Sequence, residues 1–356
     1  MPQWRGYGAS QGGSVASTTG KNGVRWRTRL FANLTTLGRL AAGPQAQSIN
    51  SLLNNRFARS IFGYLVGIDP QRRLPAFAGQ RLSQWFAARP KQPTGLRRVI
   101  LFNDSYTEYF LPQVGRATVD SLEAPSFQVI LATLGDSQRS PISLGLLDQA
   151  KRKGSRLVQA LAAMLDAATP ILVCEPSCAS ALTHDLPDLQ DETVLAAQAA
   201  SRVTMLDAFI EQELASGRIQ LNWQSMATND HPRHFVVHSH CHQKTLDGGR
   251  WTHKLLQRIP GAVVSDTNAG CCGMAGAFGY ETEHAELSIN IAQQRLLPAL
   301  NRAPLTAIVV TNGFSCRHQI ADLSKRRPIH IAEALSIFLH SAASRDTSVM
   351  LKGSIQ

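Results

Sequence analysis

The chain has 356 residues, of which 44% are hydrophobic, with six cysteines and a formal net charge of +11. This length and apolar content suffice for a large buried core, in one large domain or two smaller ones. Six unevenly spaced cysteines are not typical of a disulfide-stabilised secreted protein. No apolar stretch approaches the roughly 20 residues that a transmembrane helix needs. We therefore expect a reducing, cytoplasmic environment.

The positive charge is concentrated at the N-terminus. Residues 1–68 contain eight Lys and Arg residues and no Asp or Glu. Such a segment can be a transit peptide, a nucleic-acid arm, a surface that docks on acidic groups, or a solvated basic linker. No zinc-finger spacing or aromatic-interleaved basic strand accompanies the charge, so we do not expect a nucleic-acid partner.

The N-terminal part of the chain divides into two segments. Residues 1–24 are of low complexity and are predicted to be disordered. In residues 25–95 apolar side chains recur every three or four positions, which predicts a basic helical lead-in. The stretch Pro90–Gly95 is rich in Pro and Gly and is expected to form the border of the next domain, which we place at residues 96–340, followed by a tail at 341–356.

Short β-rich runs alternate with helical patterns in the large domain. The strand candidates are RRVILFND, FQVILAT, PILVCEP, HFVVHSH, GAVVSDT and AIVVTNG. Longer amphipathic segments such as SLGLLDQAKRKGSRLVQALAAMLDA lie between them. This alternation predicts parallel α/β layers.

The large domain also repeats itself. Three positions that follow strand candidates in its first half match three in its second half with nearly the same offset, 135 to 138 residues. The matched positions are Ser105 with Cys241, Asp136 and Ser137 with Cys271 and Cys272, and Cys178 with Cys316. We therefore predict tandem duplicated parallel α/β (Rossmann-like) units about a pseudo-two-fold axis, with repeat 1 at about 96–190 and repeat 2 at about 232–340.

Only the second repeat has a cysteine at every matched position. Because loops after parallel strands gather at one edge of a sheet, the thiols of Cys241, Cys271, Cys272 and Cys316 are expected to converge. Adjacent cysteines make a strained disulfide, so the vicinal pair points instead to a metal site. Four thiolates suit a [4Fe–4S] cluster or a tetrahedral zinc ion, and the sequence leaves both open. Cys174 and Cys178, in the first repeat, are interpreted as structural.

Further residues near these cysteines are expected to support the centre. In HSHCHQK, a strand would place His238, His240 and His242 on one face, as hydrogen-bond donors to sulfur or as ligands of a mixed His/Cys zinc site. A helix beginning near Glu281 would direct its N-terminal amides at the centre. Glycines would permit close approach and positive φ, and basic side chains would raise the potential of an anionic cluster. The candidates are His240, His242, Lys244, Gly270, Gly273, Arg317 and His318.

Several common catalytic and cofactor motifs are missing from the sequence. It has no ferredoxin-type cysteine run, no G-x-G-x-x-G after the first strand, no P-loop and no G-x-S-x-G. We therefore predict no catalytic residues, and no hydride chemistry by this chain alone.

Three stretches, HCHQK, GCCGMAGAFGYE and NGFSCRHQI, resemble the second CCG repeat in the C-terminal cysteine-rich domain of FAD-linked oxidases of the D-lactate and D-2-hydroxyglutarate dehydrogenase type. Similar repeats occur in the glycolate oxidase iron–sulfur subunit and in the B subunit of heterodisulfide reductase. The resemblance covers about residues 97–335 and extends through LVGIDPQRRLPAFAGQRLSQWF towards residue 25. It implies that the four cysteines of repeat 2 bind an iron–sulfur cluster. In repeat 1, Asp136–Ser140 stands where related proteins carry a C-C-G-R-P-like motif.

The resemblance implies an iron–sulfur electron-transfer component of a flavin-dependent 2-hydroxy-acid oxidoreductase. The flavin and ferredoxin-like domains of the fused oxidases have no counterpart in this sequence, so FAD is expected on a flavoprotein or ferredoxin-type partner. Peripheral contact with the inner face of a membrane is left open. The alternatives are a zinc-binding structural or scaffolding subunit and a degenerate fragment of a fused FAD-linked oxidase.

Overall fold

The computed structural model describes residues 26–90, 92–164, 166, 168–223 and 233–339. The predicted disordered segment 1–24 and the tail 341–356 lie outside these residues. Among the described residues, no helix combines the length and apolarity needed to cross a bilayer.

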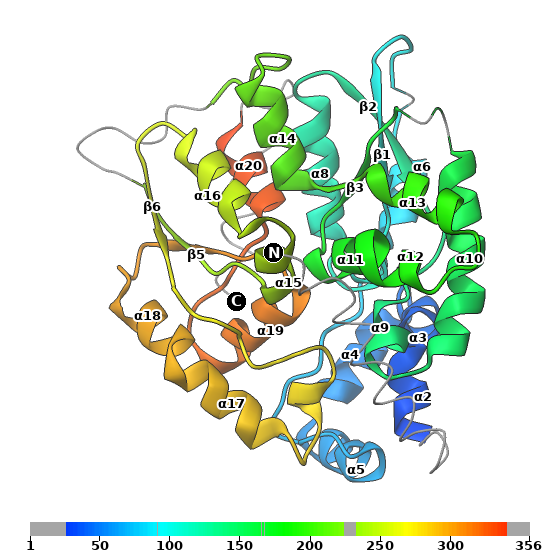
Figure 1. Ribbon diagram of the computed structural model, residues 1–356. Coiled ribbons are helices and arrows are strands. Elements are labelled where there is room, and N and C mark those ends of the chain that lie inside the picture. Colours follow the sequence, from blue (N-terminus) through cyan, green and yellow to red (C-terminus); the bar gives the residue numbers. More distant parts are fainter. Residues whose placement is uncertain (1–25, 91, 165, 167, 224–232, 340–356) are drawn as a thin grey trace.

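Two parallel sheets form the centre of the molecule (Figure 1). The first has the strand order β2-β1-β3-β4 and the second β6-β5-β7, and every strand pair is parallel. The strands are β1 (Arg97–Phe102), β2 (Phe127–Ala132), β3 (Ile171–Val173), β4 (Val203–Met205), β5 (Arg233–Val237), β6 (Ala262–Asp266) and β7 (Ile308–Val310). The predicted α/β fold class is confirmed.

The two sheets have corresponding connections, as the sequence repeat predicts. Strands β2-β1-β3 match β6-β5-β7 in order, and β4 adds a fourth strand to the first sheet. A short helix follows the central strand in both halves: α7 (Ser105–Tyr109) after β1 and α15 (Cys241–Asp247) after β5. The helices after β3 and β7 are α11 (Pro176–Ser180) and α19 (Phe314–Leu323), and each carries its matched cysteine at the third position. The matched residues therefore occupy equivalent places in the two halves.

The two halves share one hydrophobic core. Buried side chains from the first sheet, such as Val99, belong to the same cluster as Phe235 of β5. Helix α20 (Ile331–Phe338) returns from the second half and packs against α8 (Pro112–Glu123) of the first, and the Phe235 and Phe338 rings lie 5.6 Å apart. The other helices around the sheets are α9 (Arg139–Ser143), α10 (Leu147–Ala163), the π-helix Ala181–Asp185, α12 (Leu186–Asp188), α13 (Thr193–Ser201), α14 (Leu206–Ala215), α16 (Arg250–Gln257), the 3-10 turn Phe278–Tyr280, α17 (Ala285–Gln294) and α18 (Leu296–Arg302).

The described part of the lead-in is helical, as predicted, and it packs on the large domain. Its helices are α2 (Trp26–Ala32), α3 (Leu34–Ala41), α4 (Ala46–Asn54), α5 (Arg56–Val66) and α6 (Leu82–Ala87). Ile68 forms an antiparallel bridge with Glu281, and the Asp69 N–H donates to the Tyr280 carbonyl at 2.8 Å. Figure 1 shows this contact between the blue helices and the yellow loop before α17. The lead-in thus adjoins the loop that carries Cys271 and Cys272.

Candidate metal centre

Three neighbouring strand ends carry the four predicted cysteines. Cys241 opens α15 after β5, Cys271 and Cys272 lie in the loop after β6, and Cys316 lies in the first turn of α19 after β7. Because β5 is the central strand of a parallel sheet, its carboxyl end lies between those of β6 and β7. This topology brings residues 75 positions apart to the same edge.

The four thiols form a continuous chain of side-chain contacts. Cys241 interacts with Cys271, Cys271 with Cys272, and Cys272 with Cys316, and each interaction shifts the pKa values of the thiols involved. Cys241 is exposed and Cys271 is half-buried, whereas Cys272 and Cys316 are 3% and 1% exposed. All four are free thiols. The row of four thiols therefore runs from the surface into the core.

Interactions among the four thiols separate their pKa values. Cys241 and then Cys272, together with the Gly273 amide that donates to the Cys271 sulfur at 3.3 Å, lower the thiol pKa of Cys271 to about 2. The pKa of Cys316 is also lowered, chiefly by the interaction with Cys272. Cys241 and Cys272 have raised pKa values, chiefly because of their interactions with Cys271. Two of the four sulfurs thus favour the thiolate, the form that binds metals.

His238 belongs to the same cluster. Its ring, Cys272 and Cys316 are the one group of His, Cys, Asp or Glu among the described residues whose potential ligand atoms converge, all within 4.8 Å of one another. His238 follows the last residue of β5 and is 1% exposed. Its Nδ1 lies 3.2 Å from Thr267 Oγ1, and its buried Nε2 has no hydrogen-bond partner.

The expectation that HSHCHQK is a single strand is wrong. The strand ends at Val237, and His240 is the N-cap of α15, with its Nδ1 accepting from the His242 amide at 3.1 Å. The backbone therefore turns into a capped helix instead of continuing as a strand, so the strand alternation that would place the three histidines on one face does not occur. The His240 Nδ1 lies 3.8 Å from Cys241 Sγ, and the His240 and His242 rings stack at 5.4 Å. Burial, with a smaller effect of His240, lowers the pKa of His242 to about 3.

Lys244, Arg317 and His318 contact the loops of the site. The Lys244 ammonium donates to the Ala269 carbonyl, just before the vicinal cysteines. Arg317 Nη1 donates to the Thr311 and Asn312 carbonyls at 3.1 and 2.7 Å, which fastens the loop between β7 and α19. The His318 ring lies 4.3 Å from the Phe314 ring, and burial followed by Arg317 lowers its pKa to about 4. These contacts hold the loops in place.

The predicted conformational role holds for one of the two glycines. Gly273 has a φ of 90°, and a β-carbon there would overlap the Ser288 carbonyl. Gly270 is exposed, is not among the glycines with positive φ, and faces open space where a β-carbon would lie, so the positive φ predicted for Gly270 is not found. Sequence reasoning missed Gly313, where a β-carbon would overlap the His240 ring.

The helix predicted to begin near Glu281 begins later. Helix α17 starts at Ala285, and Glu281 and Glu283 take part in ion pairs in the segment before it. Arg27 of the lead-in pairs with Glu283, and His284 Nδ1 lies 2.7 Å from Glu281. The Gly273 amide, which lies in the loop before α17, donates to the Cys271 sulfur.

Arg72 is a further residue that sequence reasoning missed. This lead-in side chain is 2% exposed and reaches the loops of the site. Its Nε donates to the Gly279 carbonyl at 2.9 Å, its Nη1 pairs with Asp322 at 2.9 Å, and its Nη2 contacts the Gln319 amide oxygen. Gln319 and Asp322 lie on α19, the helix of Cys316. Arg72 therefore ties the vicinal-cysteine loop to α19.

In the first half, the place that corresponds to the candidate metal centre is occupied by side chains that hydrogen-bond to one another. Thr35 Oγ1 of α3 lies 2.7 Å from Ser105 Oγ and donates to Asp136 at 3.1 Å. Burial raises the pKa values of Asp136 and Cys178, which favours their protonated forms. Cys174 shares a hydrogen bond with Thr118 at 3.2 Å. These contacts agree with the structural interpretation of the first-half cysteines.

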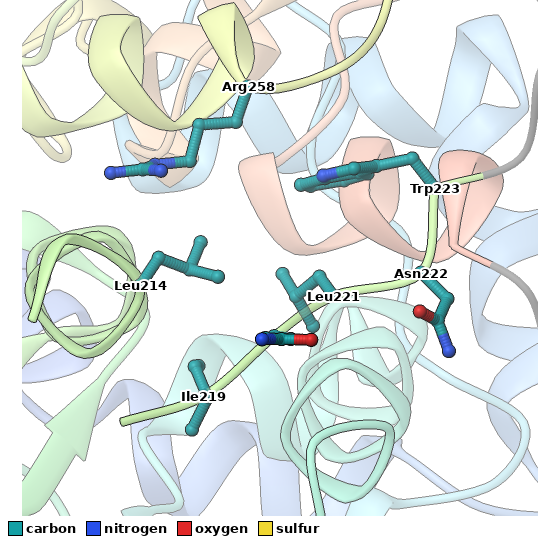
Figure 2. Close-up of a pocket in the computed structure, with 7 residues that line it drawn as sticks. Leu214, Ile219, Leu221, Asn222, Trp223 and Arg258 are labelled. Carbon is teal, nitrogen blue, oxygen red and sulfur yellow. The ribbon is translucent and has the colours of Figure 1, made fainter. Parts of the chain in front are cut away.

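A pocket of about 400 Å³ lies elsewhere, beside the end of α14. Figure 2 shows Arg258 and Trp223 on one side and Leu214, Ile219 and Leu221 on the other. Arg258 is already paired with Glu211 at 2.6 Å. None of the candidate site residues lines this pocket.

Comparisons with known proteins connect the chain to dehydrogenases. No protein-family model matches it. It is 22% identical over 323 residues to the C subunit of the anaerobic glycerol-3-phosphate dehydrogenase of Escherichia coli K12, covering 89% of this chain and 77% of that protein. It is 23% and 25% identical to the D-2-hydroxyglutarate dehydrogenases of Pantoea ananatis and E. coli K12, in each case over 67% of this chain and only 22% of the relative. These relationships, together with the converging thiols and histidine, support an oxidoreductase role.

Proposed function

We propose that this protein is an iron–sulfur electron-transfer subunit of a flavin-dependent dehydrogenase. The observation that carries the proposal is the chain of four thiols at three adjacent strand ends. A bound [4Fe–4S] cluster would supply one-electron transfer. Cys241, Cys271, Cys272 and Cys316 are the proposed ligands.

The surroundings of the thiols fit an anionic metal centre. Cys271 and Cys316 have lowered pKa values, chiefly because of their interactions with neighbouring thiols, which favours the thiolate form that binds metals. The Gly273 amide donates to Cys271, a contact of the kind that tunes cluster potentials. Because Cys241 is exposed, one side of the centre would face a partner protein.

A partner is proposed to supply the substrate site and the flavin. One relative is named as a subunit, and the D-2-hydroxyglutarate dehydrogenases are several times longer than the stretch they share with this chain. Large apolar side chains on α4 and α5 are exposed, including Leu52, Phe57, Ile61 and Leu65, each more than 60% accessible. An exposed apolar patch of this kind is typical of an interaction surface. The proposed substrate is a small anionic alcohol, either a 2-hydroxy acid or glycerol 3-phosphate.

Reconstitution with a candidate flavoprotein dehydrogenase tests the proposal. We expect the purified chain alone to show no oxidation of D-2-hydroxyglutarate, D-lactate or glycerol 3-phosphate. With the flavoprotein and its substrate, the visible absorption of the iron–sulfur centre should bleach under anaerobic conditions. Turnover by the isolated chain would contradict the proposal.

A structural zinc site is the second candidate. The observation that favours it is the compact spacing of the His238, Cys272 and Cys316 ligand atoms, within 4.8 Å, because the ligands of one tetrahedral ion lie close together. One zinc per chain and no visible absorption would establish this alternative.

A further inference from the structure

We propose that His238 Nε2 is a direct ligand of the metal centre. This inference rests on the proposed function and refines its ligand set. It begins from the convergence of His238 with Cys272 and Cys316, the two most buried thiols of the site. Neither Cys241 nor Cys271 belongs to that converging group.

The hydrogen bonds of the imidazole leave one nitrogen free. Nδ1 lies 3.2 Å from Thr267 Oγ1, so a neutral ring can donate its Nδ1–H to this hydroxyl and keep the lone pair on Nε2. Histidine ligands of metals usually have this arrangement, with the second ring nitrogen donating to an oxygen. A neutral imidazole binds through its lone pair without releasing a proton.

The free nitrogen is buried, and this requires an explanation. His238 is 1% exposed, and its Nε2 makes no hydrogen bond of normal geometry, although the ring interacts with the nearby Cys316 thiol and helps to lower its pKa. Native proteins rarely leave a buried polar atom without a well-formed partner. A metal ion beside Cys272 and Cys316 would satisfy Nε2.

The backbone holds the ring in place before any metal binds. The His238 N–H donates to the Val310 carbonyl at 2.9 Å, and the Thr267 N–H donates to the Val237 carbonyl at 3.0 Å. Both residues therefore continue the hydrogen-bonded ladders of the sheet just past the strand ends. Such a site on rigid elements positions its ligands accurately.

A histidine ligand makes one of the four thiols redundant. Four-coordinate centres take four protein ligands, whereas His238 and the four cysteines are five. Cys272 and Cys316 converge with His238, and Cys271 interacts with Cys272. The exposed Cys241, at the outer end of the chain, is the dispensable thiol. A neutral imidazole in place of a thiolate also raises the reduction potential of an iron–sulfur centre.

Metal content and pulsed electron paramagnetic resonance test this ligand assignment. The full chain, labelled with ¹⁵N-histidine, is reconstituted anaerobically with ferrous iron and sulfide, passed over a chelating resin, and reduced. We expect nitrogen hyperfine coupling in the wild type. Removing a residue that only supports a metal ligand already weakens metal binding by about 10-fold. We therefore expect His238→Leu, which removes the ligand itself, to bind iron at least about 10-fold less tightly than the wild type. Cys241→Ser should retain iron as the wild type does.

Two further variants control for misfolding. His238→Cys offers a thiolate in place of the imidazole and should restore iron binding without nitrogen coupling. Thr267→Val keeps the ring but removes its hydrogen-bond partner, and should alter the coupling. His184→Gln, at a histidine bonded to Thr183 rather than to the thiols, should change neither readout.

The outcomes separate this inference from the proposed function. A wild-type cluster without nitrogen coupling, retained in His238→Leu and lost in Cys241→Ser, would overturn the inference and leave the proposed function standing. Zinc without iron in the wild type would overturn the proposed function, and the zinc content of the same variants would then decide the ligand assignment. A wild type that binds neither metal would overturn both.

Discussion

Cys174 and Cys272 are both buried, but their neighbours differ. Cys272 lies between two other thiols, whereas Cys174 shares its hydrogen bond with the Thr118 hydroxyl, and burial raises its pKa to about 12. We interpret a protonated thiol with a hydroxyl neighbour as structural, and we propose the thiol among thiols as a metal ligand. On this proposal, the same residue type has two roles in one chain.

This difference predicts opposite results for two serine substitutions. Cys272→Ser should abolish metal binding, because it removes the thiol that links Cys271 to Cys316. Cys174→Ser should keep the wild-type metal content. Both are measured by metal analysis after anaerobic purification. Unchanged metal in Cys272→Ser would show that the site is wrongly assigned.

His330 should make the protein less stable in acid. It caps α20, with Nδ1 accepting from Ala332 and Nε2 contacting the Cys174 carbonyl at 3.1 Å, and burial followed by Arg317 lowers its pKa from 6.5 to about 3. Between these values the unfolded chain binds a proton that the folded protein excludes. The free energy of unfolding should therefore fall by about 1.4 kcal/mol for each pH unit below 6.5.

Urea unfolding of wild type and His330→Gln between pH 7 and pH 4.5 measures this contribution. The substitution should remove this part of the slope, so the two stability profiles should converge as the pH falls. Parallel profiles would contradict the assignment to His330.

Single residues differ in how far their roles could be predicted. The four cysteines were identifiable because the repeat marks equivalent strand ends. The position of His238 beside Cys272 and Cys316 could not be identified from the sequence, because the strand pattern grouped it with His240 and His242. The strand ends at Val237 and the backbone turns into a helix cap, which separates the three rings.

At the level of elements, the buried Arg72 side chain joins the lead-in to the vicinal-cysteine loop and to α19. Arg72 contacts Gly279 in one loop and Gln319 and Asp322 on α19. These partners are more than 200 positions away, so no local pattern in the sequence could indicate the contact. Helix periodicity predicted the lead-in helices but could not show which surface they cover.

Removing this cation should destabilise the protein. Arg72→Met leaves Asp322 without its buried partner, and breaking a buried ion pair typically costs about 3–5 kcal/mol. An exposed arginine of α2 provides the control, since Arg29→Met should change the free energy of unfolding by less than about 1 kcal/mol. Urea denaturation at pH 7 compares the two. Equal stabilities would show that Arg72 does not hold the loops together.

At the scale of the whole molecule, duplication explains the fold. Both sheets have the same central order, and only the second presents cysteines at all matched places. The constant offset made the architecture predictable, whereas β4 had no pattern strong enough to identify it in advance. In the first half, Thr35 from the lead-in hydrogen-bonds to Ser105 and Asp136, a contact between distant segments that the repeat alone could not indicate.

The apolar face of α5 predicts how the isolated chain behaves in solution. Phe57, Ile61 and Leu65 recur every four residues and are 72%, 64% and 63% exposed. We expect self-association of the purified wild type, and a monomeric triple variant with serine at these positions and unchanged metal content. Leu305→Ser, at a residue 92% exposed outside the lead-in, should behave as the wild type. Analytical ultracentrifugation distinguishes these states, and a monomeric wild type would contradict the expectation.

Metal and sulfide analysis of anaerobically purified wild-type protein tests the central claim most directly. The proposed function predicts about four iron and four sulfide per chain, with a brown absorption band that dithionite bleaches. One zinc per chain without colour, or free thiols without any metal, would contradict it.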